Sequence, residues 1–122
     1  MTDTKPSAQN ISAPVIRAAS SAELEDWGPL EEATGQEMQT SGLTLWEDGN
    51  GADVGIWECT PGPSRWTLET NELVHVVAGS MTVRADGGEP TDVAAGDVVL
   101  FPRGWTGTWD IHETLRKVYA IF

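Results

Sequence analysis

The chain has 122 residues, which suffices for one domain with a modest core. Its 19 acidic and 7 basic residues give a formal net charge of −12, which argues against nucleic acid and membrane surfaces as partners, because both attract basic patches. No apolar run reaches the roughly 18 residues that indicate a membrane span. The N-terminus lacks the apolar segment of a secretory signal, and Cys59 is the single cysteine, so we expect a cytoplasmic protein with no internal disulfide.

The N-terminal part of the chain is mostly polar. Residues 1–14 are interrupted by two prolines and predict a flexible arm, which leaves residues 15–122 as the single folded domain. Val15-Ile16-Arg17 could form a short added strand. Ser20-Ser21-Ala22-Glu23 fits a capping box and predicts one short helical turn that continues to about Trp27. Residues 31–41 are interpreted as a polar connector.

From Leu43 onward the pattern is typical of β-strands. Apolar, β-branched or aromatic segments recur roughly every 8 to 11 residues between Gly, Pro and Asp. The segments are Leu43–Trp46, Val54–Cys59, Trp66–Leu68, Leu73–Val77, Met81–Arg84, Asp92-Val93, Val98–Phe101, Thr106–Ile111 and Lys117–Phe122. Asn50-Gly51 and Asp86-Gly87-Gly88 are hairpin signals. The sequence therefore predicts an all-β sandwich or barrel.

Several motifs in this region carry a family resemblance. The spacing of Gly96, Pro102 and Gly104 is similar to the second half of the cupin signature. Further matching pieces are Gly55–Gly62, Asn71–Gly79, Gly104–Trp109 and Arg116–Tyr119. Together they resemble the single-domain relatives of ureidoglycine aminohydrolase, the cupin type 3 family. The resemblance implies a single-domain cupin jelly roll, with its core at about residues 43–122.

The resemblance also implies positions for metal ligands, which this chain fills differently. Metal-binding cupins use two His and a Glu in the first motif and a third His in the second. Glu72 and Gly79 keep the family spacing, but the first two His positions fall on Arg65 and Thr67, or on Trp66 and Leu68 if the spacer is one residue shorter. The third falls on Gly107. A tight transition-metal site needs three or four such ligands, so we expect no cofactor and no standard metal centre.

A non-standard divalent metal (Mn, Ni, Zn or Fe) is left as an alternative, with Glu72 and His75 as the fallback ligands. His75 follows Glu72 by three residues, and odd offsets in a regular strand point to opposite faces. We therefore favour a structural His75 that is hydrogen-bonded between packed strands. His112 is expected at the surface.

Tryptophan is unusually frequent, with six residues against one Tyr and two Phe. Core filling is the first interpretation of Trp27 and Trp46, because an indole buries a large apolar area. Trp105, Gly107 and Trp109 share one strand face, and the resemblance places that face inside the barrel. The expected ligand-binding residues are Trp57, Arg65, Thr67, Trp105, Gly107, Trp109 and Tyr119.

Glu72 is the candidate catalytic residue. A carboxylate inside a barrel either has its pKa raised by desolvation, which suits a general acid or base, or pairs with a cation, for which Arg65 is the candidate. Both alternatives stay open. Lys117 and Tyr119 share a strand face and one of them could reach the cavity, although a solvated lysine is the commoner outcome. Cys59 is expected to be a buried, inert thiol.

Three functions remain at this point. The first is a cupin that binds a small polar ligand inside the barrel without a metal. The second is a metal-dependent enzyme similar to ureidoglycine aminohydrolase, hydrolase-like or isomerase-like, and the third is a barrel packed shut and kept for assembly. The sequence leaves open whether the protein is an enzyme. A homodimer is expected because an open jelly roll has edge strands that need cover, and Leu43–Trp46 and the N-terminal arm are the candidate covering segments.

Overall fold

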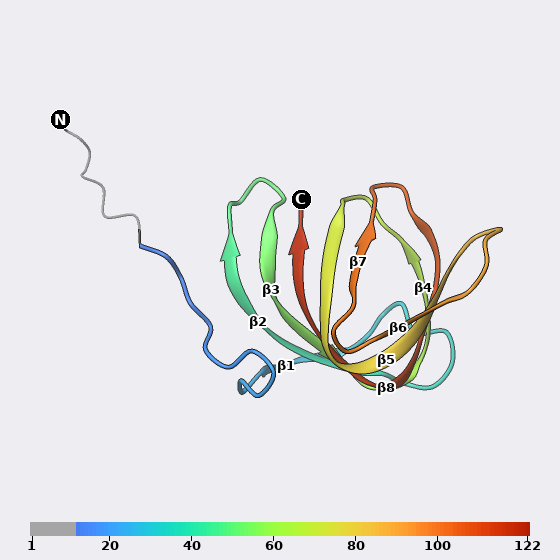
Figure 1. Cartoon of the computed structure of the whole chain (residues 1–122), viewed down its shortest axis with the longest axis horizontal. Coiled ribbons are helices and arrows are strands. Elements are labelled where there is room, and N and C mark those ends of the chain that lie inside the picture. The colour runs from blue at the N-terminus through green and yellow to red at the C-terminus, as the bar shows by residue number, and fades with distance from the viewer. Residues whose placement is uncertain (1–11) are drawn as a thin grey trace.

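The computed structural model describes residues 12–122, and every regular element in that range is a β-strand. The strands are β1 (Glu25–Pro29), β2 (Gln39–Glu47), β3 (Asp53–Cys59), β4 (Gly62–Thr67), β5 (Glu72–Ala85), β6 (Thr91–Ala94), β7 (Val98–Phe101) and β8 (Thr106–Ile121). They curl into an open barrel (Figure 1), and the segment before β1 contacts it, because Arg116 on β8 donates to the carbonyls of Ala19 and Ala22. The all-β jelly-roll prediction is confirmed. Most of the predicted N-terminal arm, residues 1–14, lies outside the described residues.

Two long strands run through both halves of the barrel. The sheet order is β1-β2-β3-β8-β5-β6, while β4 pairs with β8 and β7 pairs with β5, and every pairing is antiparallel. β3 and β4 lie end to end along β8, just as β7 and β6 lie end to end along β5. One half of the barrel is therefore β3-β8-β5-β7, and the other half is β4-β8-β5-β6.

β5 and β8 each join two segments that the sequence predicted as separate strands. β5 continues through irregular pairing at Ala78–Ser80, where Gly79 has φ 87° and lies against the backbone of β8. A Cβ at this glycine would collide with the carbonyl oxygen of Thr114. The bulge also changes which residues face inward. Val74 and Val76 are buried before it, and Met81 and Val83 after it.

The helical turn predicted for Ser20–Trp27 is wrong. A single turn forms, in which the Ser21 amide donates to the Ala18 carbonyl over 2.9 Å, and the chain then enters edge strand β1. The capping-box pattern is local, whereas the β1–β2 ladder is a tertiary contact that overrides it. Pro29 is tolerated as the last residue of an edge strand because its missing N–H faces no partner. The short strand suggested at Val15–Arg17 is likewise absent.

The stretch interpreted as a polar connector contributes to the core. Met38 is fully buried against Gly62, and β2 begins at the next residue. The remaining core residues face inward from the strands and are Cys59, Val74, Val76, Met81, Val83, Val93, Phe101, Trp109, Ile111 and Leu115. No helix in residues 12–122 is long and apolar enough to cross a membrane.

Candidate functional site

The site lies inside the β3-β8-β5-β7 half of the barrel, where alternate residues of each strand face inward. On β8 these are Leu115, Lys117 and Tyr119, all of which are buried. Lys117 lies opposite Trp57 on β3 and opposite Val76 on β5. Because residues opposite one another in a ladder point to the same side, the register places the lysine and the indole together in the interior.

Lys117 forms a buried ion pair with Glu72. The Lys117 Nζ donates to Glu72 Oε2 over 2.6 Å, and both residues are almost completely shielded from solvent. Two expectations are therefore corrected: Lys117 is not solvated, and the cation beside Glu72 is not Arg65. Arg65 lies on the outer face of β4 and pairs with Asp86 instead, because its position in the strand points away from the interior.

The ammonium group of Lys117 also lies over two indole rings. Its Nζ is 4.4 Å from the ring centroid of Trp57 and 4.6 Å from that of Trp109, within the range of a cation–π interaction. The two rings meet edge to face, and Trp66 stacks on Trp109 with centroids 4.4 Å apart. The Trp66 indole N–H donates to Ser64 Oγ, which in turn donates to the Trp109 carbonyl. The lysine is thus held by one carboxylate and a rigid aromatic wall.

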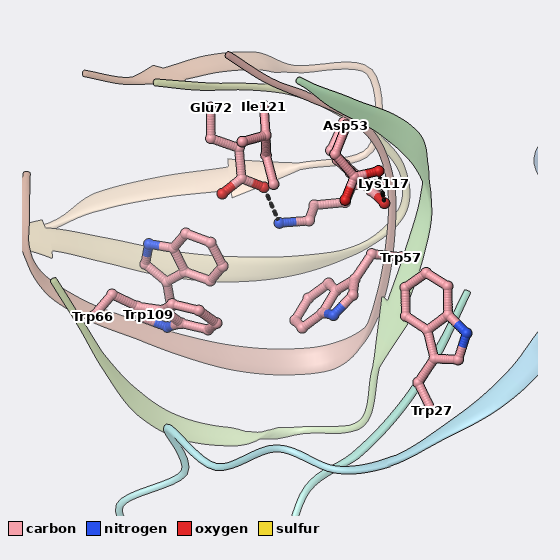
Figure 2. A pocket seen from close by; sticks show the side chains of 9 residues that line it. Trp27, Asp53, Trp57, Trp66, Glu72, Trp109, Lys117 and Ile121 are labelled. Carbon is pink, nitrogen blue, oxygen red and sulfur yellow. Dashed lines mark hydrogen bonds and ion pairs between the residues drawn. The ribbon is translucent and has the colours of Figure 1, made fainter. Parts of the chain in front are cut away.

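These groups line a cavity of about 240 Å³ (Figure 2). The lining residues are Trp27, Asp53, Trp57, Trp66, Glu72, Trp109, Lys117, Tyr119 and Ile121. In Figure 2 the side chains of Glu72 and Lys117 point toward each other, and the indoles of Trp57, Trp66 and Trp109 line the cavity beside them. Four tryptophans and a few convergent polar groups are the composition expected of a small-molecule pocket.

Two glycines shape the part of the cavity near Asp53. Gly42 on β2 leaves room for the Trp27 ring, which a Cβ at this position would strike. Trp27 is the extra residue of a bulge in β1, and bulges commonly re-aim a side chain in this way. Gly55 on β3 pairs with Tyr119, and a Cβ there would lie 3.1 Å from the phenol oxygen. The missing side chains of β2 and β3 therefore provide the space that two aromatic rings occupy.

The Tyr119 hydroxyl donates to Asp53 Oδ1 over 3.2 Å. Burial raises the pKa of Tyr119 above its ordinary value, and the nearby Asp53 charge and hydrogen bond raise it further. The phenol therefore stays neutral at physiological pH and acts as a hydrogen-bond donor. This hydrogen bond holds the Asp53 carboxylate beside the Tyr119 ring at the edge of the cavity.

The structure places the predicted catalytic residue Glu72 and the predicted ligand-binding residues in three groups. Glu72, Trp57, Trp109 and Tyr119 line the cavity. Arg65 and Thr67 are exposed on the outer face of β4, so the shorter spacer gives the correct register and Trp66 holds the interior position. Trp105 and Gly107 are outside the lining: a Cβ on Gly107 would lie 2.6 Å from the Trp105 ring, which fills the space where the sequence predicted an opening.

Sequence reasoning missed five of the lining residues as site residues: Trp27, Asp53, Trp66, Lys117 and Ile121. Core filling is wrong for Trp27 and Trp46, whose exposed fractions are 39% and 49%. For Trp66 the sequence offered a signal, because the shorter spacer before Glu72 places a ligand position of the family on this residue. No local signal indicated Asp53 or Trp27, because a bulge and the register of three strands bring them to the cavity.

The two histidines lie on the outer surface. His75 points away from Glu72, as its odd offset predicts, but it is exposed rather than buried between strands, which corrects that part of the expectation. His112 is exposed, as expected, and bonds the Thr82 hydroxyl over 2.7 Å. Since His75 is on the other face of β5, it cannot join Glu72 in holding a metal ion.

The donor set of the cavity does not fit the divalent metal of metal-binding cupins. The Lys117 ammonium already bonds one Glu72 oxygen and would repel a cation, and Trp66 and Gly107 supply no ligand atom. Within residues 12–122 no three His, Cys, Asp or Glu side chains gather into a metal-binding cluster. The chemistry open to this cavity is hydrogen bonding, ion pairing and stacking on indoles.

Cys59 is fully buried, as expected. Burial raises the pKa of its thiol from 9.0 to about 11, and the Lys117 charge opposes this only in part. A thiol that stays protonated and shielded from solvent is a poor nucleophile.

The family model for the EutQ-like cupin domain matches residues 47–119, more than half of the chain. The chain belongs to the EutQ-like cupin family. No curated protein matches the chain. The match spans β3 to β8 almost completely, and these strands carry every lining residue of the cavity except Trp27.

Solved structures share this fold. A DUF861-family protein of unknown function from Pseudomonas syringae pathovar tomato has a TM-score of 0.76 and 23% identity over 84% of this chain. This EutQ-like cupin spans 46% of that longer protein. A putative ethanolamine utilization protein, EutQ of Salmonella typhimurium, has a TM-score of 0.64 and 25% identity, covering 78% of this chain and 76% of its own. A Thermotoga maritima DUF861-family protein is 33% identical, with a TM-score of 0.53, over 55% of this chain and 76% of its own.

Proposed function

We propose that this EutQ-like cupin binds a small polar organic molecule inside its barrel, without a standard metal centre. The observation that carries the proposal is the cavity of about 240 Å³, walled by four indoles and containing Asp53, Glu72, Lys117 and Tyr119. Pockets for drug-sized ligands occupy about 300–1,000 Å³, so the ligand is smaller than these.

The proposal is supported by the rigidity of the cavity walls. The Glu72–Lys117 pair and the stack of Trp66 on Trp109 hold the wall in one arrangement, so a ligand does not have to order it. Indole faces offer apolar contact area, while Asp53 and Glu72 offer acceptors for the ligand's polar hydrogens. A barrel kept only for assembly would have no need of such a cavity, which makes that third function the least supported.

A ligand screen tests the proposal. Small neutral, cationic and anionic compounds are added to the protein, and tryptophan fluorescence and the thermal midpoint are recorded. We expect one charge class to quench fluorescence and raise the midpoint. The response should weaken in Trp57→Phe, which reshapes the cavity wall, and persist in the matched control Trp46→Phe, whose indole is exposed on β2. Absence of any response in the wild-type protein contradicts the proposal.

A metal-dependent activity similar to that of ureidoglycine aminohydrolase is the alternative. It is supported by the position of Glu72 in the cavity wall and opposed by the Lys117 ammonium, which already bonds that carboxylate. The test is a titration with manganese, nickel or zinc, followed by the thermal midpoint. A large stabilisation that disappears in Glu72→Ala favours the enzyme, whereas a response to organic compounds alone favours the metal-free binder.

We also propose that the protein forms a homodimer through the outer face of the β3-β8-β5-β7 half. Leu73, Val98 and Leu100 are exposed there, next to partly exposed Val54 and Val118. Burial of this face by a second copy would remove an apolar surface from water. Light scattering at micromolar concentration should report a dimer that Leu100→Glu converts to a monomer. A wild-type monomer under these conditions contradicts the proposal.

The cytoplasm is the proposed location. It is supported by the single cysteine, which is a buried free thiol. Fractionation of cells that express the native chain tests this, and recovery of the protein outside the cytoplasm contradicts it.

A further inference from the structure

We infer that the ligand of the cavity is a small organic cation of the primary ammonium class, such as a protonated alkylamine. The inference rests on the proposed binding function and adds the chemical class of the ligand. It follows from the balance of charge in the lining, from the aromatic surfaces beside it, and from the interactions that Lys117 already makes.

The cavity lining has an excess of negative charge. Its charged groups are the carboxylates of Asp53 and Glu72 and the ammonium of Lys117. Lys117 is committed to Glu72 at 2.6 Å, which leaves the charge of Asp53 without a cationic partner in the lining. Burying a charge is costly unless it is paired, so an incoming cation beside Asp53 improves the balance and an incoming anion worsens it.

The hydrogen bonds of the lining point to the same ligand charge. Lys117 donates one N–H to Glu72, and the Tyr119 hydroxyl donates to Asp53. Among the described residues the Trp109 indole N–H is a buried lining donor without a hydrogen-bond partner, so an anion would find a neutral donor there, but in a lining whose net charge is negative. A ligand ammonium needs only acceptors, and the two carboxylates have oxygen lone pairs to spare.

The indoles supply the second part of the recognition. Lys117 shows that a primary ammonium is accepted at the faces of Trp57 and Trp109, with centroid distances of 4.4 and 4.6 Å. Trp27, Trp57 and Asp53 lie on the same side of the cavity in Figure 2. A ligand ammonium at Asp53 would therefore have indole rings nearby, the arrangement that stabilises desolvated cations.

Three probes of matched size and different charge test the inference: n-propylammonium, 1-propanol and propionate, all at constant ionic strength. Binding to the full chain is followed by tryptophan fluorescence and calorimetry. We expect propylammonium to bind at least about tenfold more tightly than propanol, the effect of one partly desolvated ion–carboxylate and cation–π contact, and propionate to bind most weakly.

Two variants then locate the site. Asp53→Asn removes the charge but keeps an acceptor for Tyr119, and it should abolish the preference for propylammonium over propanol. Asp110→Asn is the matched control, because Asp110 is exposed on the outer face of β8 and its loss changes the net charge equally. Trp27→Ala should weaken propylammonium binding and Trp46→Ala should not. Trp27 is partly exposed, so its truncation leaves the core intact if Asp53→Asn fails to fold.

The outcomes separate the two proposals. Equal affinity for the three probes, tighter binding of propionate, or an unchanged preference in both Asp53→Asn and Trp27→Ala overturns the inference and leaves the binding function standing. If propylammonium does not bind while another small molecule enters the cavity, the inference is likewise overturned and the binding function stands. If no compound binds, both proposals fail.

Discussion

Two regions of this cupin hold a carboxylate and a cation at the same distance, but one pair is buried and the other is exposed to solvent. Inside the barrel, Lys117 Nζ lies 2.6 Å from Glu72 Oε2, with exposed side-chain fractions of 4% and 9%. On the outer surface near the β5–β6 turn, Arg65 Nη2 lies 2.6 Å from Asp86 Oδ2, with exposed fractions of 51% and 48%. Distance alone therefore says little about what an ion pair does.

The difference lies in the solvent around each pair. At the surface, water solvates either partner if the other is removed, so the pair contributes little to stability. In the interior, each charge has given up its hydration and depends on the other, so that removal of one leaves an uncompensated buried charge. The outer pair shifts ionisation locally: its hydrogen bond from Arg65 holds the pKa of Asp86 below the ordinary value. The inner pair holds the wall of the proposed ligand cavity.

Breaking the inner pair should give the largest effect. Lys117→Met leaves Glu72 buried without a cation and should lower the free energy of unfolding by about 3–5 kcal/mol. Urea denaturation measures the loss. Arg103→Met is the control, because it removes one positive charge from an exposed position in the β7–β8 connection. A loss below about 1 kcal/mol would show that water or protonation of Glu72 compensates the missing lysine.

Removing both partners of the inner pair should cost less than removing one. In Glu72→Gln/Lys117→Met no unpaired charge remains, and the volumes stay nearly unchanged. We expect the double variant to lie within about 2 kcal/mol of wild type and to show a favourable coupling energy in the double-mutant cycle. Additive losses in urea denaturation would mean that the two side chains act independently and would contradict the buried-pair interpretation.

The interior should also be more sensitive to alkaline pH than the outer surface. Because burial raises the pKa of Cys59 from 9.0 to about 11, the protonated thiol is favoured in the folded state. Its contribution is complete below pH 9 and is lost as the pH rises through 11, on the order of 2 kcal/mol. Urea denaturation at a series of pH values measures how steeply the free energy of unfolding falls with pH, which is the slope of interest. Cys59→Ala should flatten it between pH 9 and 10, before Tyr119 begins to contribute at higher pH.

The outer pair should give the smallest effect. Arg65→Ala removes the partner of Asp86, but both groups are well solvated, so we expect no resolvable change in the urea midpoint at either low or high salt. A loss of stability in Arg65→Ala as large as that in Lys117→Met would contradict the distinction between a weak surface pair and a strongly coupled buried pair.

Much of the fold could be predicted from the sequence because its signals are local. Alternating apolar residues between Gly, Pro and Asp indicated the strands after Leu43, and the motif spacing indicated a cupin. The predictions failed where a distant contact decided the structure. β1 replaces the predicted helical turn because it pairs with β2, and Met38 is buried because Gly62 leaves room for it.

The candidate site could be predicted only in part. Glu72, Trp57, Trp109 and Tyr119 were identified, since parity and the family spacing placed them inward. Lys117 was expected in water, as most lysines are, and its burial depends on the register of β8 with β3 and β5. Trp27 reaches the cavity through a bulge in a strand that the sequence did not predict.

By itself the sequence determined a single all-β domain with a glutamate facing inward, because turn residues and strand alternation act over a few positions of the chain. Only the tertiary structure decided which cation meets that glutamate, which indoles surround it, and whether space remains beside them. These depend on strand register and bulges, and a shift of one residue sends a side chain to the opposite face.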